Sequence, residues 1–166
     1  MIQGARIAGA ARIIAVDLSA EKMELAREFG ATDTVTPGGD AVKDIQGLTN
    51  GIGVDYGFEV VGNGKLIESC IKSVRRHGVA VLVGIGGRND RFSLNGMILP
   101  VTAKSIVGCM YGSCNFKVDF PRYLDFYQRG MLDLDRLISR TYTLEDAPQA
   151  FEDLKNGGNA RGVIVY

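Results

Sequence analysis

The feature that most constrains this chain of 166 residues is the repeated alternation of short apolar runs with longer amphipathic segments. Short apolar runs are typical of strands buried in a parallel sheet, and amphipathic segments of about ten residues are typical of the helices that cover it. This alternation predicts right-handed βαβ units. We therefore expect an α/β fold with a mostly parallel, doubly wound sheet and helices on both faces.

The expected strands cover residues 12–17, 33–36, 54–61, 79–84, 105–111 and 161–166. The expected helices cover residues 2–10, 20–29, 40–48, 65–77, 120–128 and 147–154. Ser19 is a candidate N-cap for the second helix, and Gly30 is a candidate terminator because glycine adopts the left-handed conformation readily. No repeat, low-complexity tract or linker interrupts the pattern, so we expect one domain over residues 1–166.

The chain begins with an expected helix, whereas a doubly wound domain ordinarily begins with a strand. In the strand order 3-2-1-4-5-6 that first strand is central. Without it, strands 12–17 and 54–61 would each have an unpaired apolar edge. We therefore expect a gap between them, direct pairing of the two, or filling by another chain. A strand formed within residues 1–10 would contradict this expectation.

Composition excludes several classes of function. The 19 basic and 19 acidic residues cancel, which leaves no basic surface for nucleic acid or an anionic membrane. No apolar run approaches the roughly 20 residues of a membrane-spanning helix, and the first residues lack the layout of a signal peptide. The odd number of cysteines, in a chain too large to need disulfides, favours a reducing, cytoplasmic setting.

The cysteines and the single histidine do not form a metal signature. Cys109 and Cys114 fall on an expected strand and the loop after it, Cys70 falls on an expected helix, and His77 falls at the end of that helix. Such scattered residues do not make a zinc site. Serine-nucleophile and phosphate-loop motifs are absent as well, so we expect no metal ligand and no catalytic residue in this chain.

Asp17 is the most informative single residue. It ends an expected strand just before a helix, where a carboxylate can accept hydrogen bonds from both ribose hydroxyls of an adenosine. Its charge would repel a 2′-phosphate, and Leu18 follows it in place of an arginine, so NAD is expected in preference to NADP. The alternative is an exposed acid at a strand end, or a cap for the helix that starts near Ser19.

The glycine-rich turn that normally precedes such an acid is absent. None of the 22 glycines forms the pattern G-x-G-x-x-G; three stretches begin it and then fail, at residues 51–53, 62–64 and 84–86. The acid normally lies about 20 residues after the turn. Counting back from Asp17 passes the first residue, so the turn is expected to be missing from this sequence rather than altered within it.

Two further strand ends and one arginine are candidate ligand contacts. Residues 59–62 and 83–87 lie at strand ends, at the edge where ligands of open α/β sheets bind, and glycine lets a ring approach the backbone. Arg161, beside Gly162, carries a guanidinium suited to bidentate contact with phosphate. Ordinary strand-to-loop turns and a solvated surface arginine are the alternatives.

Taken together, these stretches resemble the zinc-dependent alcohol dehydrogenases of the medium-chain dehydrogenase/reductase superfamily. The matching segments, in order, are residues 2–35, 53–62, 78–87, 105–112 and 160–166. In that family a helix with G-A-x-x-A-G-A follows the glycine turn, a strand ends in V-D, and the next helix ends in G-A-T. Within the family, the chain most resembles the formaldehyde-active thiol-adduct enzymes and the aryl-alcohol dehydrogenases.

The resemblance implies NAD as the coenzyme and gives individual residues a role in binding it. Asp17 matches the acid on the adenosine ribose, with Leu18 next to it, and Lys22 matches a lysine that flanks it. The other matches are Val60, Val61 and Gly62 at the adenosine side, Val83, Gly84 and Ile85 at the nicotinamide carboxamide, Cys109 and Tyr111 beside the nicotinamide, and Arg161 at the pyrophosphate. Residues 105–112 match the strand that forms the family's homodimer interface.

The family's catalytic zinc ligands, structural-zinc lobe, first strand and glycine turn have no counterpart here. The resemblance therefore implies a Rossmann-like domain that is incomplete at its N-terminus, with Met1 an internal residue of the helix after the turn. The parent enzyme would transfer a hydride between NAD and an alcohol or thiol–aldehyde adduct, and this chain alone would be inactive.

Two other functions compete with this one. The first is a non-catalytic module that binds NAD, AMP or ADP-ribose through Asp17. The second is a methyltransferase, which also places an acid after its second strand to hold a ribose. The motifs after the strands and the match at residues 105–112 argue against the methyltransferase.

Overall fold

The computed structural model describes residues 1–37, 40–157 and 161–166. The helices are α1 (Ile2–Ile7), α2 (Ala20–Glu28), α3 (Ala41–Leu48), α4 (Gly64–Ser73), α5 (Ile98–Thr102), α6 (Phe116–Gln128) and α7 (Ala147–Lys155), with single 3₁₀ turns at Tyr111–Ser113 and Asp135–Leu137. The strands are β1 (Ile14–Val16), β2 (Asp33–Val35), β3 (Val54–Glu59), β4 (Val74–Leu82), β5 (Ser105–Gly108), β6 (Arg140–Tyr142) and β7 (Gly162–Ile164).

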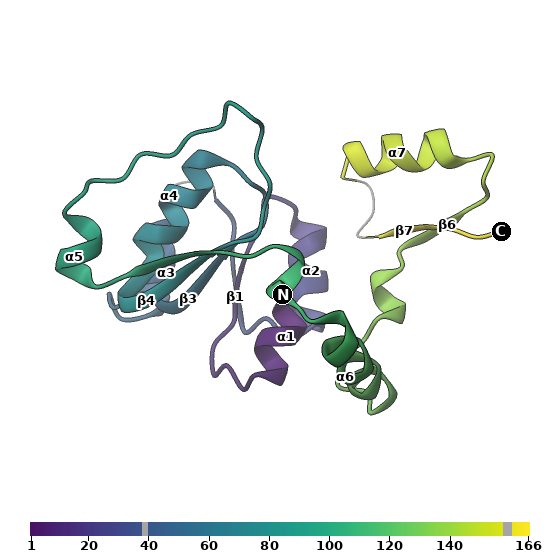
Figure 1. The fold of residues 1–166 in the computed structure, drawn as a ribbon, viewed down its shortest axis with the longest axis horizontal. Coiled ribbons are helices and arrows are strands. Elements are labelled where there is room, and N and C mark those ends of the chain that lie inside the picture. The colour runs from purple at the N-terminus through teal and green to yellow at the C-terminus, as the bar shows by residue number, and fades with distance from the viewer. Residues whose placement is uncertain (38–39, 158–160) are drawn as a thin grey trace. The chain divides into compact units, whose positions relative to one another are not determined.

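Every strand pair in the described part of the chain is parallel, which confirms the predicted α/β class. β1 pairs with β2, β4 lies between β3 and β5, and β6 pairs with β7 (Figure 1). Ser19 caps α2 as predicted, since its side chain accepts a hydrogen bond from the N–H of Lys22, and Gly30 follows the helix with φ +111°.

β1 and β3 are not hydrogen-bonded to each other in the described residues, so the sheet is interrupted between them. Direct pairing of these two edges, one of the three expected outcomes, is therefore not what the structure shows. Residues 2–7 form helix α1 and supply no strand. The pairing of β7 with β6 was not foreseen, because β6 has only three residues and no distinctive apolar pattern.

The chain packs as two compact units, formed by residues 11–116 and by residues 3–10 with 117–166. In the first unit, α4 lies across β3 and β4 (Figure 1). Its buried Ile71, together with Val74 and Ala80, forms the core. Partly buried residues complete this cluster, namely Val54, Ile67, Cys70, Leu94 and Ile106.

In the second unit, α1 is joined to the turn after α6 by a buried amide. The side chain of Gln3 donates to the Asp133 carbonyl at 2.7 Å and accepts from the Asp133 N–H at 2.6 Å. Arg6 donates to the Met131 carbonyl at 2.7 Å. Because Gln3 is only 6% exposed, its paired bonds offset the cost of burying the amide.

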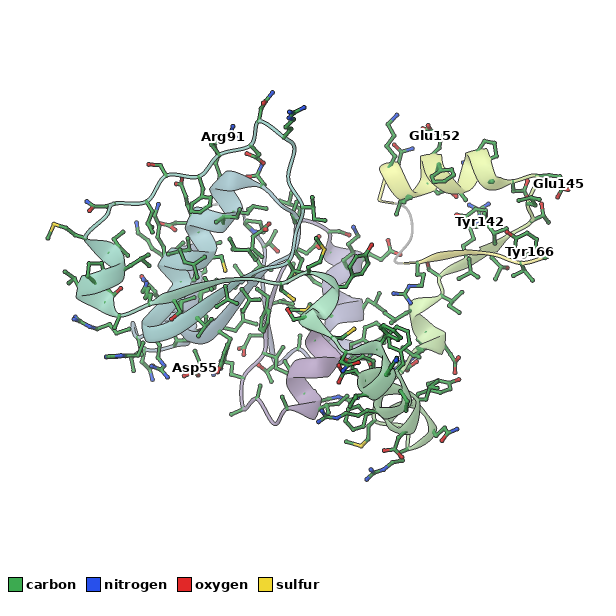
Figure 2. All side chains as sticks on the ribbon, viewed as in Figure 1. Asp55, Arg91, Tyr142, Glu145, Glu152 and Tyr166 are labelled. Atoms are coloured by element: carbon green, nitrogen blue, oxygen red, sulfur yellow. The ribbon has the colours of Figure 1, made fainter. Side chains whose placement is uncertain are left out.

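The β6–β7 pair is joined to α7 through a carboxylate. Tyr142, labelled on β6 in Figure 2, donates its hydroxyl to Asp153 of α7 at 2.7 Å. Hydrogen bonds from Tyr142 and Gln149, together with the charge of Arg140, lower the pKa of Asp153. This interaction stabilises the folded unit above the unfolded-state pKa of an aspartate, and it is lost as the pH falls through the lowered value.

The predicted helix over residues 65–77 is wrong at its C-terminal end. α4 stops at Ser73, and β4 begins at Val74 with φ −74° and ψ 139°. The apolar spacing continues to Val74 because this residue packs in the same core from the strand. His77 therefore lies within β4, at φ +60°, rather than at a helix terminus, and Gly78 does not terminate a helix.

Ile71 provides a direct test of the core around α4. It is 1% exposed, so we expect Ile71→Val to lower the free energy of unfolding by about 0.5–1.5 kcal/mol and Ile71→Ala by about 2–5 kcal/mol. Urea denaturation followed by circular dichroism measures both. Ile52→Ala, at a residue 67% exposed, is the control and should change little. Equal effects at the two positions would contradict the assigned core.

Candidate coenzyme-binding site

Asp17 lies directly after β1 and is oriented by the start of α2. Its Oδ1 accepts a hydrogen bond from the Ser19 N–H at 2.9 Å. Its Oδ2 accepts no hydrogen bond from the described residues and is available for a ligand. The alternative in which Asp17 caps α2 is not what the structure shows, because Ser19 occupies the N-cap. Leu18 is 78% exposed, and Lys22 is exposed within the first turn of α2.

The turn after β3 contains Val60, Val61 and Gly62. The two valine side chains are exposed, while the backbone beneath them is fixed by the buried carboxylate of Glu59. Gly62 has φ +85°, a conformation that side-chain-bearing residues rarely adopt. The structure thus presents this turn at the carboxyl end of β3, as predicted from the sequence.

Residues 83–85, after β4, lie against this turn with backbone touching backbone. A Cβ built on Gly84 would lie 2.6 Å from the backbone nitrogen and carbonyl carbon of Val61, and one built on Gly62 would lie 2.7 Å from the Ile85 oxygen. Real side chains do not approach so closely. The structure therefore brings two of the predicted segments together, and only glycine is compatible with their separation.

The segment after β5 agrees only in part with the predicted strand over residues 105–111. β5 ends at Gly108, and the Cys109 N–H extends the ladder by donating to the Leu82 carbonyl at 2.9 Å. Tyr111 does not lie on the strand, which corrects the prediction. It begins a 3₁₀ turn with φ +48° and is 90% exposed, because consecutive left-handed residues turn the chain away from the sheet.

Arg161 precedes β7 in the second unit. Its carbonyl accepts from the Ser139 N–H at 3.0 Å, and its own N–H donates to the Ser139 hydroxyl at 3.3 Å. These bonds fix the backbone where β6 and β7 begin to pair, and the residue as a whole is exposed. Its proposed contact with a pyrophosphate remains a prediction.

Glu59 begins the strand-end segment that the sequence analysis identified, but it was given no role of its own there. It is 4% exposed at the last position of β3. The sequence placed this acid inside the strand expected over residues 54–61, and the structure ends β3 at Glu59. Burial raises the pKa of the Cys70 thiol to about 11, and the charge of Glu59 contributes to this shift.

Within residues 1–37, 40–157 and 161–166, no three histidine, cysteine, aspartate or glutamate side chains are grouped so that they could hold a metal ion. The three cysteines are free thiols. In the same residues, every helix is too short or too polar to cross a membrane. The described residues therefore do not form a zinc site. The strand ends after β1, β3 and β4 instead provide hydrogen-bonding groups and backbone surface, which suit a nucleotide.

Residues 1–129 match the family model described as zinc-binding dehydrogenase. The match covers most of the chain, including Asp17, the paired glycine segments and β5. The chain belongs to the zinc-binding dehydrogenase family. It spans about half the length of the curated relatives that it matches.

Among these relatives of the zinc-binding dehydrogenase family, the S-(hydroxymethyl)glutathione dehydrogenase of Escherichia coli O1:K1 / APEC is 33% identical over 169 residues, which cover 100% of this chain and 46% of that protein. The crystal structure of benzyl alcohol dehydrogenase from Acinetobacter calcoaceticus matches with a TM-score of 0.93 at 27% identity, over 98% of this chain and 45% of that one. A zinc-binding dehydrogenase from Sinorhizobium meliloti 1021, solved bound to NADP, matches with a TM-score of 0.89 at 26% identity, over 99% and 48% of the two chains.

The glycine contact between the two segments can be tested by adding one methyl group. We expect Gly62→Ala to lower the free energy of unfolding by at least about 1 kcal/mol, because the new Cβ meets backbone and the residue has positive φ. Amide resonances of residues 83–86 should shift as well. Gly87→Ala is the matched control, since a Cβ there has no heavy atom within 4 Å. Similar behaviour of the two variants would rule out the close contact.

Proposed function

We propose that this chain binds NAD as the coenzyme-binding part of a zinc-type alcohol dehydrogenase. The observation that carries the proposal is the arrangement at the strand ends of residues 11–116. There, one oxygen of the Asp17 carboxylate remains available, and two glycine segments lie backbone against backbone. Ligands of open α/β sheets bind at this edge. Membership of the family supports the same conclusion.

At the adenosine end, we assign the ribose to Asp17. An ionised carboxylate has about four lone-pair sites, and the Ser19 N–H uses one of them. The carboxylate can therefore accept from both ribose hydroxyls, with Leu18 and Lys22 beside it. Its charge disfavours the 2′-phosphate of NADP, the coenzyme bound to the Sinorhizobium meliloti relative. We accordingly propose a preference for NAD.

At the nicotinamide end, we assign the carboxamide to Val83, Gly84 and Ile85. Cys109, whose N–H donates to the Leu82 carbonyl, and Tyr111, in the turn that follows, are assigned to the nicotinamide. The N–H groups of Val83 and Gly84 are already bonded to the Glu59 carbonyl at 2.8 and 3.0 Å. We therefore expect the carboxamide to use carbonyl oxygens of this segment. Bound NAD would supply the hydride acceptor.

The zinc chemistry of the family is not assigned to this chain, because its described residues contain no fitting ligand set. We propose that hydride transfer with an alcohol or thiol–aldehyde adduct takes place only in a longer protein that provides those ligands. In that protein, a further strand would lie between β1 and β3, as in the doubly wound order. A homodimer through residues 105–112 and a cytoplasmic location belong to the same proposal.

A second candidate is a non-catalytic module that binds adenine nucleotides. The observation that favours it is that the acid at the ribose position is oriented and available, whereas the described residues lack a metal-binding cluster. AMP binding without dehydrogenase activity is common to both candidates for the isolated chain. A longer protein that contains this sequence together with zinc ligands separates them: it forms NADH if the first candidate is right and does not if the second is right.

Asp17 carries the first test of NAD binding. We expect Asp17→Ala to weaken binding of both AMP and NAD by at least about tenfold, because charge-assisted hydrogen bonds to the ribose are lost. The preference for NAD over NADP should narrow. Titration calorimetry measures all three ligands. Glu21→Ala removes an exposed acid from the first turn of α2 and is the control. Equal affinity of wild type and Asp17→Ala would refute the ribose contact.

Catalysis carries the second test. We expect the purified 166-residue chain, supplied with zinc, NAD and benzyl alcohol or S-(hydroxymethyl)glutathione, to form no NADH above the rate without protein. The physical reason is that nothing in its described part can hold the zinc that would activate the alcohol. Absorbance of NADH monitors the reaction, and benzyl alcohol dehydrogenase assayed in parallel is the positive control. NADH formation by the chain would contradict the proposal that the zinc ligands are provided only by a longer protein.

A further inference from the structure

Glu59 is a buried charge that makes none of the coenzyme contacts assigned above. Its carboxylate accepts hydrogen bonds from three consecutive backbone N–H groups of the turn after β3. The distances are 3.0 Å from Val61, 2.9 and 3.0 Å from Gly62 to the two oxygens, and 3.5 Å from Asn63. A carboxylate 4% exposed would be costly without such donors. The turn is thus folded around this side chain.

The backbone of the same residue is bonded to the other segment. The Glu59 carbonyl accepts from the N–H groups of Val83, at 2.8 Å, and Gly84, at 3.0 Å. One residue therefore holds the adenosine-side turn with its carboxylate and the nicotinamide-side segment with its carbonyl. A change in the position of Glu59 is transmitted to both.

Side-chain packing cannot replace these bonds where the two segments meet. Gly62, Gly84 and Gly86 face one another with no room for a Cβ. Apolar side chains that would normally fix the separation of two loops are excluded by that geometry. Hydrogen bonds to an ionised acceptor are about twice as strong as neutral ones, so the carboxylate is well suited to fix the turn.

We propose that Glu59 is a positioning residue that sets the separation between residues 60–62 and residues 83–85, and so between the two halves of the coenzyme site. It acts through the backbone and does not touch the coenzyme. The proposal rests on the proposed NAD binding. Its consequence is that Glu59 matters more for NAD, which must span both segments, than for AMP, which uses the adenosine side alone.

The test compares Glu59→Gln with Glu68→Gln in the full 166-residue chain. Glutamine keeps the size of the side chain but replaces one acceptor oxygen with an NH₂ group, which would face the N–H donors of the turn. Glu68 is a matched control. Its carboxylate also accepts a backbone N–H, that of Ser93 at 2.8 Å, but in the loop beyond the site.

The first measurement is amide hydrogen exchange without ligand. We expect Glu59→Gln to speed exchange by at least about tenfold at Val61 and Gly62, and to a smaller extent at Val83 and Gly84. Glu68→Gln should leave all four amides unchanged. Since the charge of Glu59 helps to raise the pKa of Cys70, the variant should also alkylate faster at Cys70 in alkaline buffer. Unchanged exchange at both segments would overturn the proposal.

The second measurement is calorimetric titration with NAD and with AMP. We expect Glu59→Gln to weaken NAD binding by about tenfold or more and AMP binding by less than about threefold. Equal losses for the two ligands would show general damage to the site and would overturn the positioning role. If Glu59→Gln does not fold, Glu59→Asp keeps the charge one methylene further back, and the same unequal loss is expected from it.

A wild-type chain that binds neither nucleotide would refute the proposed function. Amide exchange would still decide whether Glu59 couples the two segments, because that measurement needs no ligand. If exchange rises at residues 61–62 but not at 83–84, the two segments are held independently and the positioning role is wrong.

Discussion

Direct contact between two stretches of backbone, after β3 and after β4, is the constraint on which the rest of the described site depends. It requires glycine at 62, 84 and 86, because any Cβ there would meet main-chain atoms of the opposite segment. It also requires that the N–H of the buried Gly62 finds a partner. Glu59 meets that requirement with its side chain, and its carbonyl accepts from the opposite segment.

The same turn leads directly into α4, so the site and the core share one constraint. Asn63 caps α4 through bonds to the N–H groups of Lys65 and Leu66. The helix then carries Ile71 into contact with Val74 and Ala80 of β4. A displacement of the turn would therefore tilt the helix that covers the sheet. This linkage gives a physical reason for the presence of a buried carboxylate beside an apolar core.

The sequence was informative wherever a short-range physical rule determines the structure. Ser19 and Gly30 were identified as the cap and terminator of α2, because both depend only on local backbone chemistry. The parallel α/β class followed from the alternation of elements. The sequence placed residues 60–62 and 83–85 at strand ends on the ligand-binding edge, whereas their direct contact was found only in the structure.

Other features depend on tertiary packing and could not be foreseen. The apolar spacing up to Val74 is equally compatible with one longer helix and with a helix followed by a strand, and the core selects the second. Tyr111 looked like the continuation of a strand, but the left-handed residues around it stop β5 at Gly108. β6 has too few residues for any pattern to reveal it. The role of Glu59 became visible only when its hydrogen bonds were known.

The interruption of the sheet determines how firmly the two ends of the site are joined. Asp17 follows β1, in the two-stranded sheet, whereas the glycine segments belong to the three-stranded sheet of β3, β4 and β5. Within residues 11–116, α3 contacts both β2 and α4 and so connects the two sheets. Helix packing by dispersion contacts permits small sliding movements, whereas a ladder of hydrogen bonds fixes register. Groups on one sheet are therefore held more rigidly relative to one another than to groups on the other. A ligand that uses Asp17 alone does not depend on the weaker connection, whereas a dinucleotide that spans both sheets does.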